Sequence, residues 1–158
     1  MDNGFAISVR NLVKRFGGFT AVDNISFDVR RGEIFGFLGA NGAGKNTAMR
    51  MLCGLSCPTS GSGTVAGYDI ARQAEEIKRH IGYMSQKFSL YGDLTVSENL
   101  TLFSTVYGMS DKDIRLKSDM IFKTLEMEEM KNCLVKDIPV GWKQKLAFSA
   151  ATMHAPDV

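Results

Sequence analysis

The chain has 158 residues, of which 44% are hydrophobic and 23% charged, and its formal net charge is +2 at pH 7. This length fits one domain with a real core, and the composition excludes a fibrous or disordered chain. The charge is too small, and the Lys and Arg residues are too scattered, to indicate nucleic-acid binding. No apolar run approaches the roughly 20 residues of a membrane span, and the N-terminus lacks a signal-peptide core. We therefore expect a cytosolic chain.

The cysteines and histidines show no metal-binding pattern. Cys53, Cys57 and Cys133 form an odd set without a CxxC pair, which is typical of a reducing compartment and indicates no zinc site. We expect Cys53 to pack in the core. His80 and His154 are isolated, and we interpret both as ordinary surface or core residues.

The first thirty residues predict an antiparallel sheet, with extended segments at 6–16, 20–22 and 25–29. Apolar and polar residues alternate strictly over 25–30, as in a strand with one face in water. Phe16 lies in the turn sequence KRFGGF, where its ring can project from the chain. Two interpretations remain open: the ring is a stacking platform for a nucleotide base, or it is a hydrophobic plug of the turn.

Residues 33–52 organise the rest of the chain. The apolar run 34–38 predicts a strand buried on both faces. The glycine-rich loop 39–45 follows, and then a helix that ends at Gly54. In this arrangement glycines turn backbone N–H groups toward an anion, the helix N-terminus adds positive charge, and Lys45 can reach outer phosphates. A glycine-rich turn without a ligand is the alternative, and the lysine argues against it.

The position after Lys45 departs from the pattern G-x-x-x-x-G-K-[ST]. Asn46 stands where a hydroxyl would bind the magnesium ion that bridges the outer phosphates, and Thr47 comes one place later. A carboxamide oxygen can ligate magnesium, but it is longer and differently aimed. We expect nucleotide binding to survive this change better than metal-assisted chemistry.

The middle of the chain predicts short elements. A loop is expected at 58–63, a strand at 64–66, and an exposed helix at 71–80. Residues 81–84 predict a second short buried strand, after which Gln86 follows. Ligands collect at the C-terminal ends of strands in open α/β sheets, so Gln86 is a candidate site residue. The alternative is a surface glutamine at the start of a loop.

Helices dominate after residue 87. Thr95 and Glu98 have the spacing of a capping box, and Gly108 ends the helix that follows. Ser110 with Asp113 repeats the start signal for a second helix. A last helix is expected to begin within 138–146 and to run through residue 153, with a face of small apolar residues.

In combination, these motifs resemble the nucleotide-binding domain of ABC transporters. The resemblance is carried by the loop GANGAGKNT, the turn aromatic Phe16, the predicted strand ending at Gln86, the helical insertion, and the element from Gly141 to Gln144. Two sequence segments, YMSQKFSLYGDLTVSENL and GWKQKLA, are most similar to those of bacterial multidrug-efflux ATPases. The resemblance covers essentially the whole chain.

The resemblance implies an α/β fold, that of a P-loop NTPase of ABC type with an antiparallel β subdomain and a helical insertion. Residues 1–86 would form the nucleotide-binding core with that β subdomain, 87–137 the helical subdomain, and 138–158 the signature element and following helix. The family's second core motif, which supplies a magnesium ligand and a water-activating glutamate, would come just after residue 158. We expect these 158 residues alone to be unstable, oligomeric or completed by another chain, and nearly inactive.

The resemblance also implies roles for individual residues. Phe16 would stack on the adenine of ATP. Lys45 and Gln86 would act in catalysis, and Asn46 and Gln86 would hold Mg²⁺. The phosphates of ATP would be contacted by Gly39, Asn41, Gly42, Ala43, Gly44, Lys45, Asn46 and Thr47.

The signature element, residues 138–144, would close over ATP held by the opposite domain of a head-to-tail pair. Gly141 and Gln144 match the family pattern, whereas Pro139 replaces its serine and Val140 its first glycine. We expect these two replacements to weaken the contact.

For function, the resemblance implies the ATP-binding subunit or domain of an export-type multidrug efflux transporter, which couples ATP binding and hydrolysis to transport. Its partners would be a second ABC nucleotide-binding domain, in the same or a neighbouring chain, and transmembrane transporter subunits. It would be cytoplasmic and peripheral at the inner face of the cell membrane. The alternative is a non-catalytic nucleotide-binding or interaction module from a degenerate ABC domain. Soluble ABC-type ATPases of translation or repair are a third, less favoured class.

Overall fold

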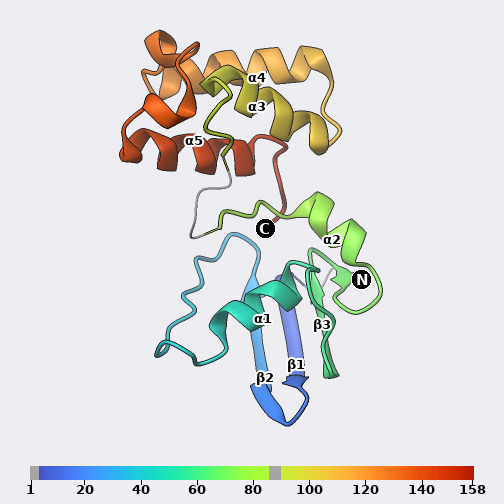
Figure 1. Cartoon of the computed structure of the whole chain (residues 1–158). Coiled ribbons are helices and arrows are strands. Elements are labelled where there is room, and N and C mark those ends of the chain that lie inside the picture. Colours follow the sequence, from blue (N-terminus) through green and yellow to red (C-terminus); the bar gives the residue numbers. More distant parts are fainter. Residues whose placement is uncertain (1–3, 86–89) are drawn as a thin grey trace. The chain divides into compact units, whose positions relative to one another are not determined.

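The computed structural model describes residues 4–85 and 90–158, which form two compact units (Figure 1). The sheet unit comprises the chain up to Ile81 together with Asp157 and Val158, and the helical unit comprises Gly82–Pro156. The sheet unit contains β1 (Phe5–Phe16), β2 (Phe19–Arg30), α1 (Lys45–Leu52), β3 (Ser60–Val65), β4 (Tyr68–Asp69) and α2 (Ala74–His80). The helical unit contains α3 (Val96–Val106), α4 (Asp111–Thr124), the 3₁₀ turns η1 (Glu128–Met130) and η2 (Val135–Asp137), and α5 (Val140–Thr152).

The sheet has the strand order β2-β1-β3-β4, and every pairing is antiparallel. This confirms the sheet predicted for the first thirty residues. The two segments expected at 20–22 and 25–29 belong to one strand, because the pairing with β1 continues through a bulge at Asp23 and Asn24. Asn11 and Asn24 both have a φ of 49°, and the Asn11 side-chain amide donates to the side-chain oxygen Oδ1 of Asn24 at 2.9 Å. Asparagine tolerates this left-handed backbone, so the bulge does not break the strand.

The loop expected at 58–63 is partly wrong, because β3 already begins at Ser60. Gly61 and Gly63 lie within the strand and face β1 at close range. A Cβ added to Gly61 would clash with the Asn11 carbonyl oxygen. Here glycine permits a close approach of two backbones rather than a flexible turn.

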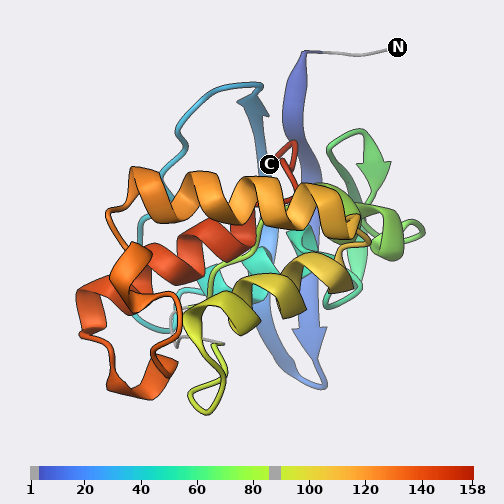
Figure 2. The same ribbon diagram turned by 90° about the horizontal axis from the view of Figure 1, so that it is seen from above.

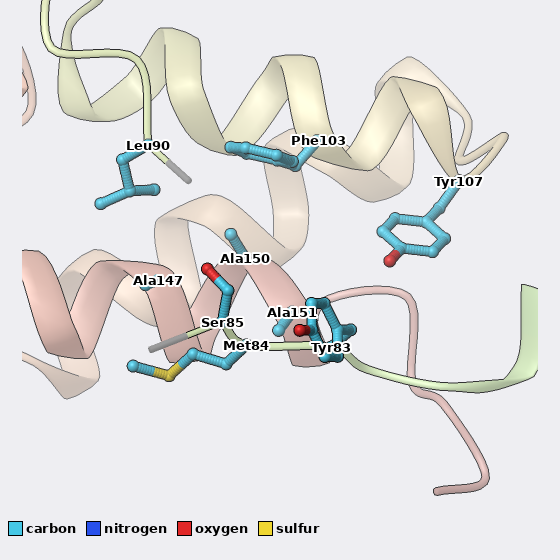
Figure 3. A pocket seen from close by; sticks show the side chains of 9 residues that line it. All are labelled: Tyr83, Met84, Ser85, Leu90, Phe103, Tyr107, Ala147, Ala150 and Ala151. Carbon is cyan, nitrogen blue, oxygen red and sulfur yellow. The ribbon is translucent and has the colours of Figure 1, made fainter. Parts of the chain in front are cut away.

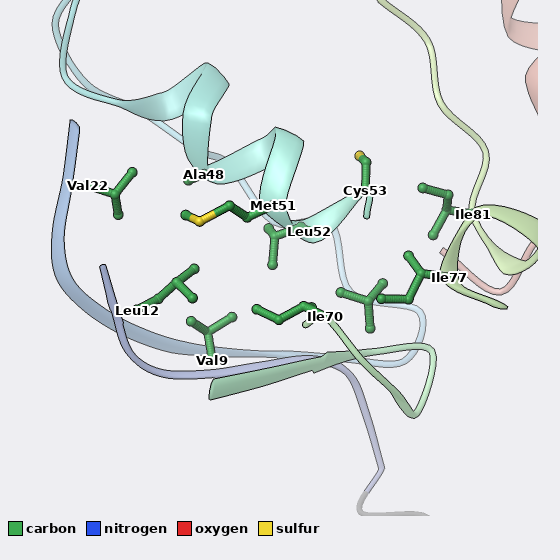
Figure 4. Close-up of a cluster of buried hydrophobic side chains, with 11 residues drawn as sticks. Val9, Leu12, Val22, Ala48, Met51, Leu52, Cys53, Ile70, Ile77 and Ile81 are labelled. Carbon is green, nitrogen blue, oxygen red and sulfur yellow. The ribbon is translucent and has the colours of Figure 1, made fainter. Parts of the chain in front are cut away.

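A hydrophobic core lies between the sheet and α1, with further contributions from α2 and Ile81 (Figure 4). Helix α1 buries Ala48, Met51 and Leu52 in this core, whereas Met49 is exposed. Cys53 is buried here, as predicted. The core residues are Val9, Leu12, Val22, Ala48, Met51, Leu52, Cys53, Val65, Ile70, Ile77 and Ile81.

The two buried strands predicted at 34–38 and 81–84 are wrong for the described residues, which place no strand at either segment. Ile34 is 100% and Leu38 93% exposed, and Tyr83 and Met84 are each 42% exposed. A buried strand exists only where neighbouring strands pair with it, and the described residues supply no neighbour at either place. Between these exposed residues, Phe35 stacks on Phe27 of β2 with ring centroids 5.2 Å apart.

In the helical unit, α3 packs against both α4 and α5 (Figure 2). The predicted start signals are confirmed, since Thr95 and Glu98 form a capping box at α3 and Ser110 caps α4. Helix α5 starts after Pro139 as expected. Among residues 4–85 and 90–158, no helix combines the length and apolar character that a membrane span requires.

Candidate functional site

The glycine-rich loop curls ahead of α1 and is held against the sheet. Gly42 and Gly44 have φ values of 85° and 80°, which side-chain-bearing residues rarely adopt. The Ala43 N–H donates to the Ala40 carbonyl at 3.2 Å, which closes a turn inside the loop. A Cβ on Gly44 would clash with the Ala21 carbonyl oxygen of β2. The antiparallel sheet therefore fixes where the loop ends and α1 begins.

The N-terminus of α1 is open. Gly44 is its N-cap, no side chain caps it, and its first turn carries no acidic residue. The first hydrogen bond of the helix runs from the Ala48 N–H to the Gly44 carbonyl at 2.9 Å. The N–H groups of the preceding positions have no intrahelical acceptor, and the helix dipole adds positive charge to them. This end of α1 can therefore bind an anion.

The Lys45 side chain folds back across the loop. Its Nζ atom donates to the carbonyl oxygens of Gly39 and Ala40, at 2.5 and 2.6 Å. These bonds hold the ammonium group against the first residues of the loop. A polyphosphate entering the loop would offer the ammonium stronger, charged acceptors in place of two neutral carbonyls.

A hollow of about 340 Å³ lies beside the first turns of α1 and is lined by Phe16, Thr47, Arg50 and Ser56. Phe16 ends β1, and its side chain is 55% exposed. The structure thus brings the predicted base platform next to the predicted phosphate-binding helix. The exposure of the ring favours the platform interpretation over the buried plug, because a plug would be covered.

The remaining predicted residues do not all lie at the loop and α1. Asn41 and Asn46 are exposed in the loop and in the first turn of α1. Gln86 falls outside the described residues. Gly141 and Gln144 are exposed at the start of α5 and belong to the helical unit, not to the sheet unit that carries the loop. Among the described residues, no three or more His, Cys, Asp or Glu side chains gather into a metal-binding group.

Two cations near the hollow were not identified from the sequence. The Lys14 ammonium lies 5.1 Å from the centre of the Phe16 ring. Arg50 lines the hollow together with Thr47. The spacing in the sequence could have identified both. Lys14 is two residues from Phe16 in a strand, so the two side chains share a face, and Arg50 is three residues from Thr47 in a helix, so the two are neighbours.

The helical unit has a pocket of its own, of about 190 Å³ (Figure 3). Tyr83, Met84 and Ser85 line one side, and side chains of α3 and α5 line the rest, namely Phe103, Tyr107, Ala147, Ala150 and Ala151, together with Leu90. Among the described residues, its lining is mostly apolar or aromatic and includes no Lys or Arg.

Comparison with known proteins agrees with this geometry. A family profile described as ABC transporter matches residues 22–158. The chain is 44% identical over 152 residues to the probable multidrug ABC transporter ATP-binding protein YbhF of Escherichia coli (strain K12), covering 96% of this chain and 26% of that protein. It is 34% identical over 152 residues to the linearmycin resistance ATP-binding protein LnrL of Bacillus subtilis (strain 168), covering 96% of this chain and 49% of that protein. The chain thus spans at most about half the length of these two relatives.

Solved structures show the same fold. One, described as the ATP-binding subunit of an ABC transporter, has a TM-score of 0.84 at 27% identity and covers 96% of this chain and 63% of its own. Another, cbiO1 from Clostridium perfringens, has a TM-score of 0.84 at 21% identity, covers 98% of this chain and 63% of its own, and supports the fold alone. The chain therefore belongs to the ABC transporter family, and its fold is that of a P-loop NTPase of ABC type.

Proposed function

We propose that this chain is the ATP-binding part of an export-type multidrug efflux transporter, in which ATP binding and hydrolysis are coupled to transport. The observation that carries the proposal is the open N-terminus of α1 behind a curled loop, with the Lys45 ammonium held across it. The similarity to a multidrug ABC transporter ATP-binding protein supports the transport role.

In this proposal the chain's own residues bind and orient the nucleotide. The backbone N–H groups of Gly42 and of residues 44–47 hold the phosphate chain, and Lys45 leaves the two carbonyls to bind the outer phosphates. Phe16 stacks on the adenine. Mg²⁺ supplies charge neutralisation for phosphoryl transfer when it is bound, and Asn46 and Gln86 are the residues that would hold it.

The proposed partners are a second ABC nucleotide-binding domain and transmembrane transporter subunits, which place the chain at the cytoplasmic face of the cell membrane. Gly141 and Gln144 would face ATP bound by the second domain. Helix α5 supports this role, because it has neither a capping side chain nor an acidic residue in its first turn. Such a helix end favours an anion brought by a partner.

We further propose that a polypeptide of these 158 residues binds ATP poorly and hydrolyses it hardly at all. Phosphoryl transfer depends on a positioned metal ion and water, and Asn46 places a longer, differently aimed side chain where a hydroxyl would bind the metal. A non-catalytic nucleotide-binding or interaction module is the second candidate. It is favoured by Asn46, which stands on the first turn of α1 in place of a hydroxyl-bearing residue.

Equilibrium binding of a fluorescent ATP analogue tests the proposal, measured with and without magnesium on the unaltered chain and on Asn46→Thr. Tight magnesium-dependent binding by the unaltered chain supports the coupling role and shows that Asn46 serves the metal. Binding that becomes magnesium-dependent only in Asn46→Thr supports the non-catalytic module. Absence of binding by both proteins contradicts a nucleotide site at this loop.

A further inference from the structure

Lys14 is fixed in place beside the exposed Phe16 ring. Its ammonium lies over that ring at 5.1 Å from the centroid and donates to the Cys57 carbonyl oxygen at 2.7 Å. The side chain thus joins the end of β1 to the segment that follows α1. A cation held over an aromatic face is attracted by the negative charge of that face.

The same segment is tied to β1 by backbone bonds. The Arg15 N–H donates to the Thr59 hydroxyl at 3.0 Å, and the Thr59 N–H donates to the Val13 carbonyl at 2.8 Å. Ser56, in the same segment, lines the hollow that Phe16 also lines. The last residues of β1 and the segment after α1 therefore form one braced wall, and Phe16 is its exposed ring.

We propose that Lys14 is a positioning residue for the nucleotide base: it holds the Phe16 ring in the orientation that a purine ring stacks against. This inference rests on the proposed function, since it takes ATP as the ligand of the loop. An exposed phenylalanine that rotates freely loses side-chain entropy when a base stacks on it. A ring already held by a cation avoids part of that loss, so the base binds more tightly.

Lys14 should affect only ligands that carry a base, because it acts through the Phe16 ring and not through contacts with the phosphates. It does not line the hollow beside α1, and its Nζ atom donates to the Cys57 carbonyl. Its contribution should therefore appear for a nucleotide, which has a base, and vanish for inorganic tripolyphosphate, which has only the phosphate chain.

The experiment compares Lys14→Met with Lys14→Arg in the full chain, by calorimetric titration with MgATP and with magnesium tripolyphosphate at one ionic strength. Methionine keeps much of the stem and removes the charge, whereas arginine restores a cation that can lie on the ring. We expect Lys14→Met to weaken MgATP binding by about two- to fivefold, the range for an exposed cation–π contact. Tripolyphosphate binding stays unchanged, and Lys14→Arg binds MgATP as the unaltered chain does.

A double-mutant cycle with Phe16→Leu sharpens the test. Once the ring is gone, Lys14→Met should cause no further loss of MgATP affinity. An equal loss for both ligands, or the same loss in the Phe16→Leu background, would overturn the inference, because Lys14 would then act on the loop or the phosphates. Unchanged MgATP binding by Lys14→Met would overturn it as well. If the unaltered chain bound neither ligand, the proposed function would fall first and this inference with it.

Discussion

The first N–H groups of a helix have no acceptor within the helix, and the N-termini of α1 and α3 differ in what they offer to these groups. At α3 the Thr95 side chain accepts from the Glu98 N–H at 3.1 Å, and the Glu98 carboxylate accepts from the Thr95 N–H at 2.7 Å. At α1 no side chain caps the helix, and the residue before it is Gly44 with a φ of 80°. The chain therefore closes one helix with its own side chains and leaves the other open. An open end in a glycine-lined loop beside a lysine indicates a ligand site, whereas a closed end indicates structure alone.

The comparison predicts that the largest loss comes from moving the open loop. Gly44→Ala places a Cβ against the Ala21 carbonyl of β2 and strains a positive φ. We expect ATP affinity to fall by at least about 100-fold, since displacing the loop breaks several charge-assisted hydrogen bonds of about 1.5–3 kcal/mol each. Isothermal titration calorimetry measures the affinity.

The matched control is Gly108→Ala, because Gly108 also has a positive φ, of 76°, but a Cβ there would meet nothing within 4 Å. This variant should lose about 1 kcal/mol of stability from backbone strain and retain ATP binding. Equal ATP affinity in the two glycine variants would show that the loop is not the binding site.

Lys45→Met is expected to have the next largest effect. It removes the ammonium group from the loop, and ATP affinity should fall by about 10- to 100-fold, the value of one hydrogen bond to a charged group. The control is Lys117→Met, since Lys117 likewise donates to a backbone carbonyl, that of Met153, at 2.9 Å. Competition of ATP against a fluorescent analogue compares the two, and an unchanged Lys45→Met would contradict the assignment.

Changing the closed helix should affect stability and leave binding intact. Thr95→Ala removes the N-cap of α3 and should lower the free energy of unfolding of the helical unit by about 1 kcal/mol. Thr101→Ala is the control, because its hydroxyl bonds the Ser97 carbonyl within the helix and caps nothing. Thermal denaturation measures the stability of each variant, and an ATP titration measures its affinity. A loss of ATP affinity in Thr95→Ala would contradict the distinction between a ligand-binding end at α1 and a purely structural end at α3.

The smallest effect is a pH dependence at the closed end. The Thr95 backbone N–H and hydroxyl bind the Glu98 carboxylate and lower its pKa. A depressed folded-state pKa adds stability that is present above the unfolded-state value and lost as pH falls through the folded one. Glu98→Gln keeps the capping box but does not titrate. Its melting temperature should approach that of the unaltered chain as pH falls from neutral to about 3, and a gap that stayed constant would contradict this.

Local features of the fold were predictable from the sequence. The alternation over 25–30 and the spacing of Thr95 and Glu98 are short-range patterns, and both gave elements at the expected places. The loop 39–45 and the start of α1 followed from glycines next to a lysine.

The wrong predictions concern residues whose structure depends on segments that are distant in the sequence. Residues 34–38 have the composition of a buried strand but no strand to pair with among the described residues. The sequence predicts a turn at Gly61, but this residue lies in β3. Glycine is required there because β1 approaches too closely for a side chain. Lys14 acquired its neighbours, the Phe16 ring and the Cys57 carbonyl, only through the packing of β1 against the segment after α1.

The most direct test of the phosphate-binding loop is an NMR titration of the ¹⁵N-labelled chain with MgATP, following the backbone amides at both helix ends. Because the end of α1 is open, we expect large chemical-shift changes for the amide signals of Gly42, Gly44, Lys45, Asn46 and Thr47. The amide signals of Val96, Ser97 and Glu98, at the closed end of α3, should keep their chemical shifts. ATP-dependent shifts that left the amides of 42–47 unmoved would contradict a phosphate site at this loop.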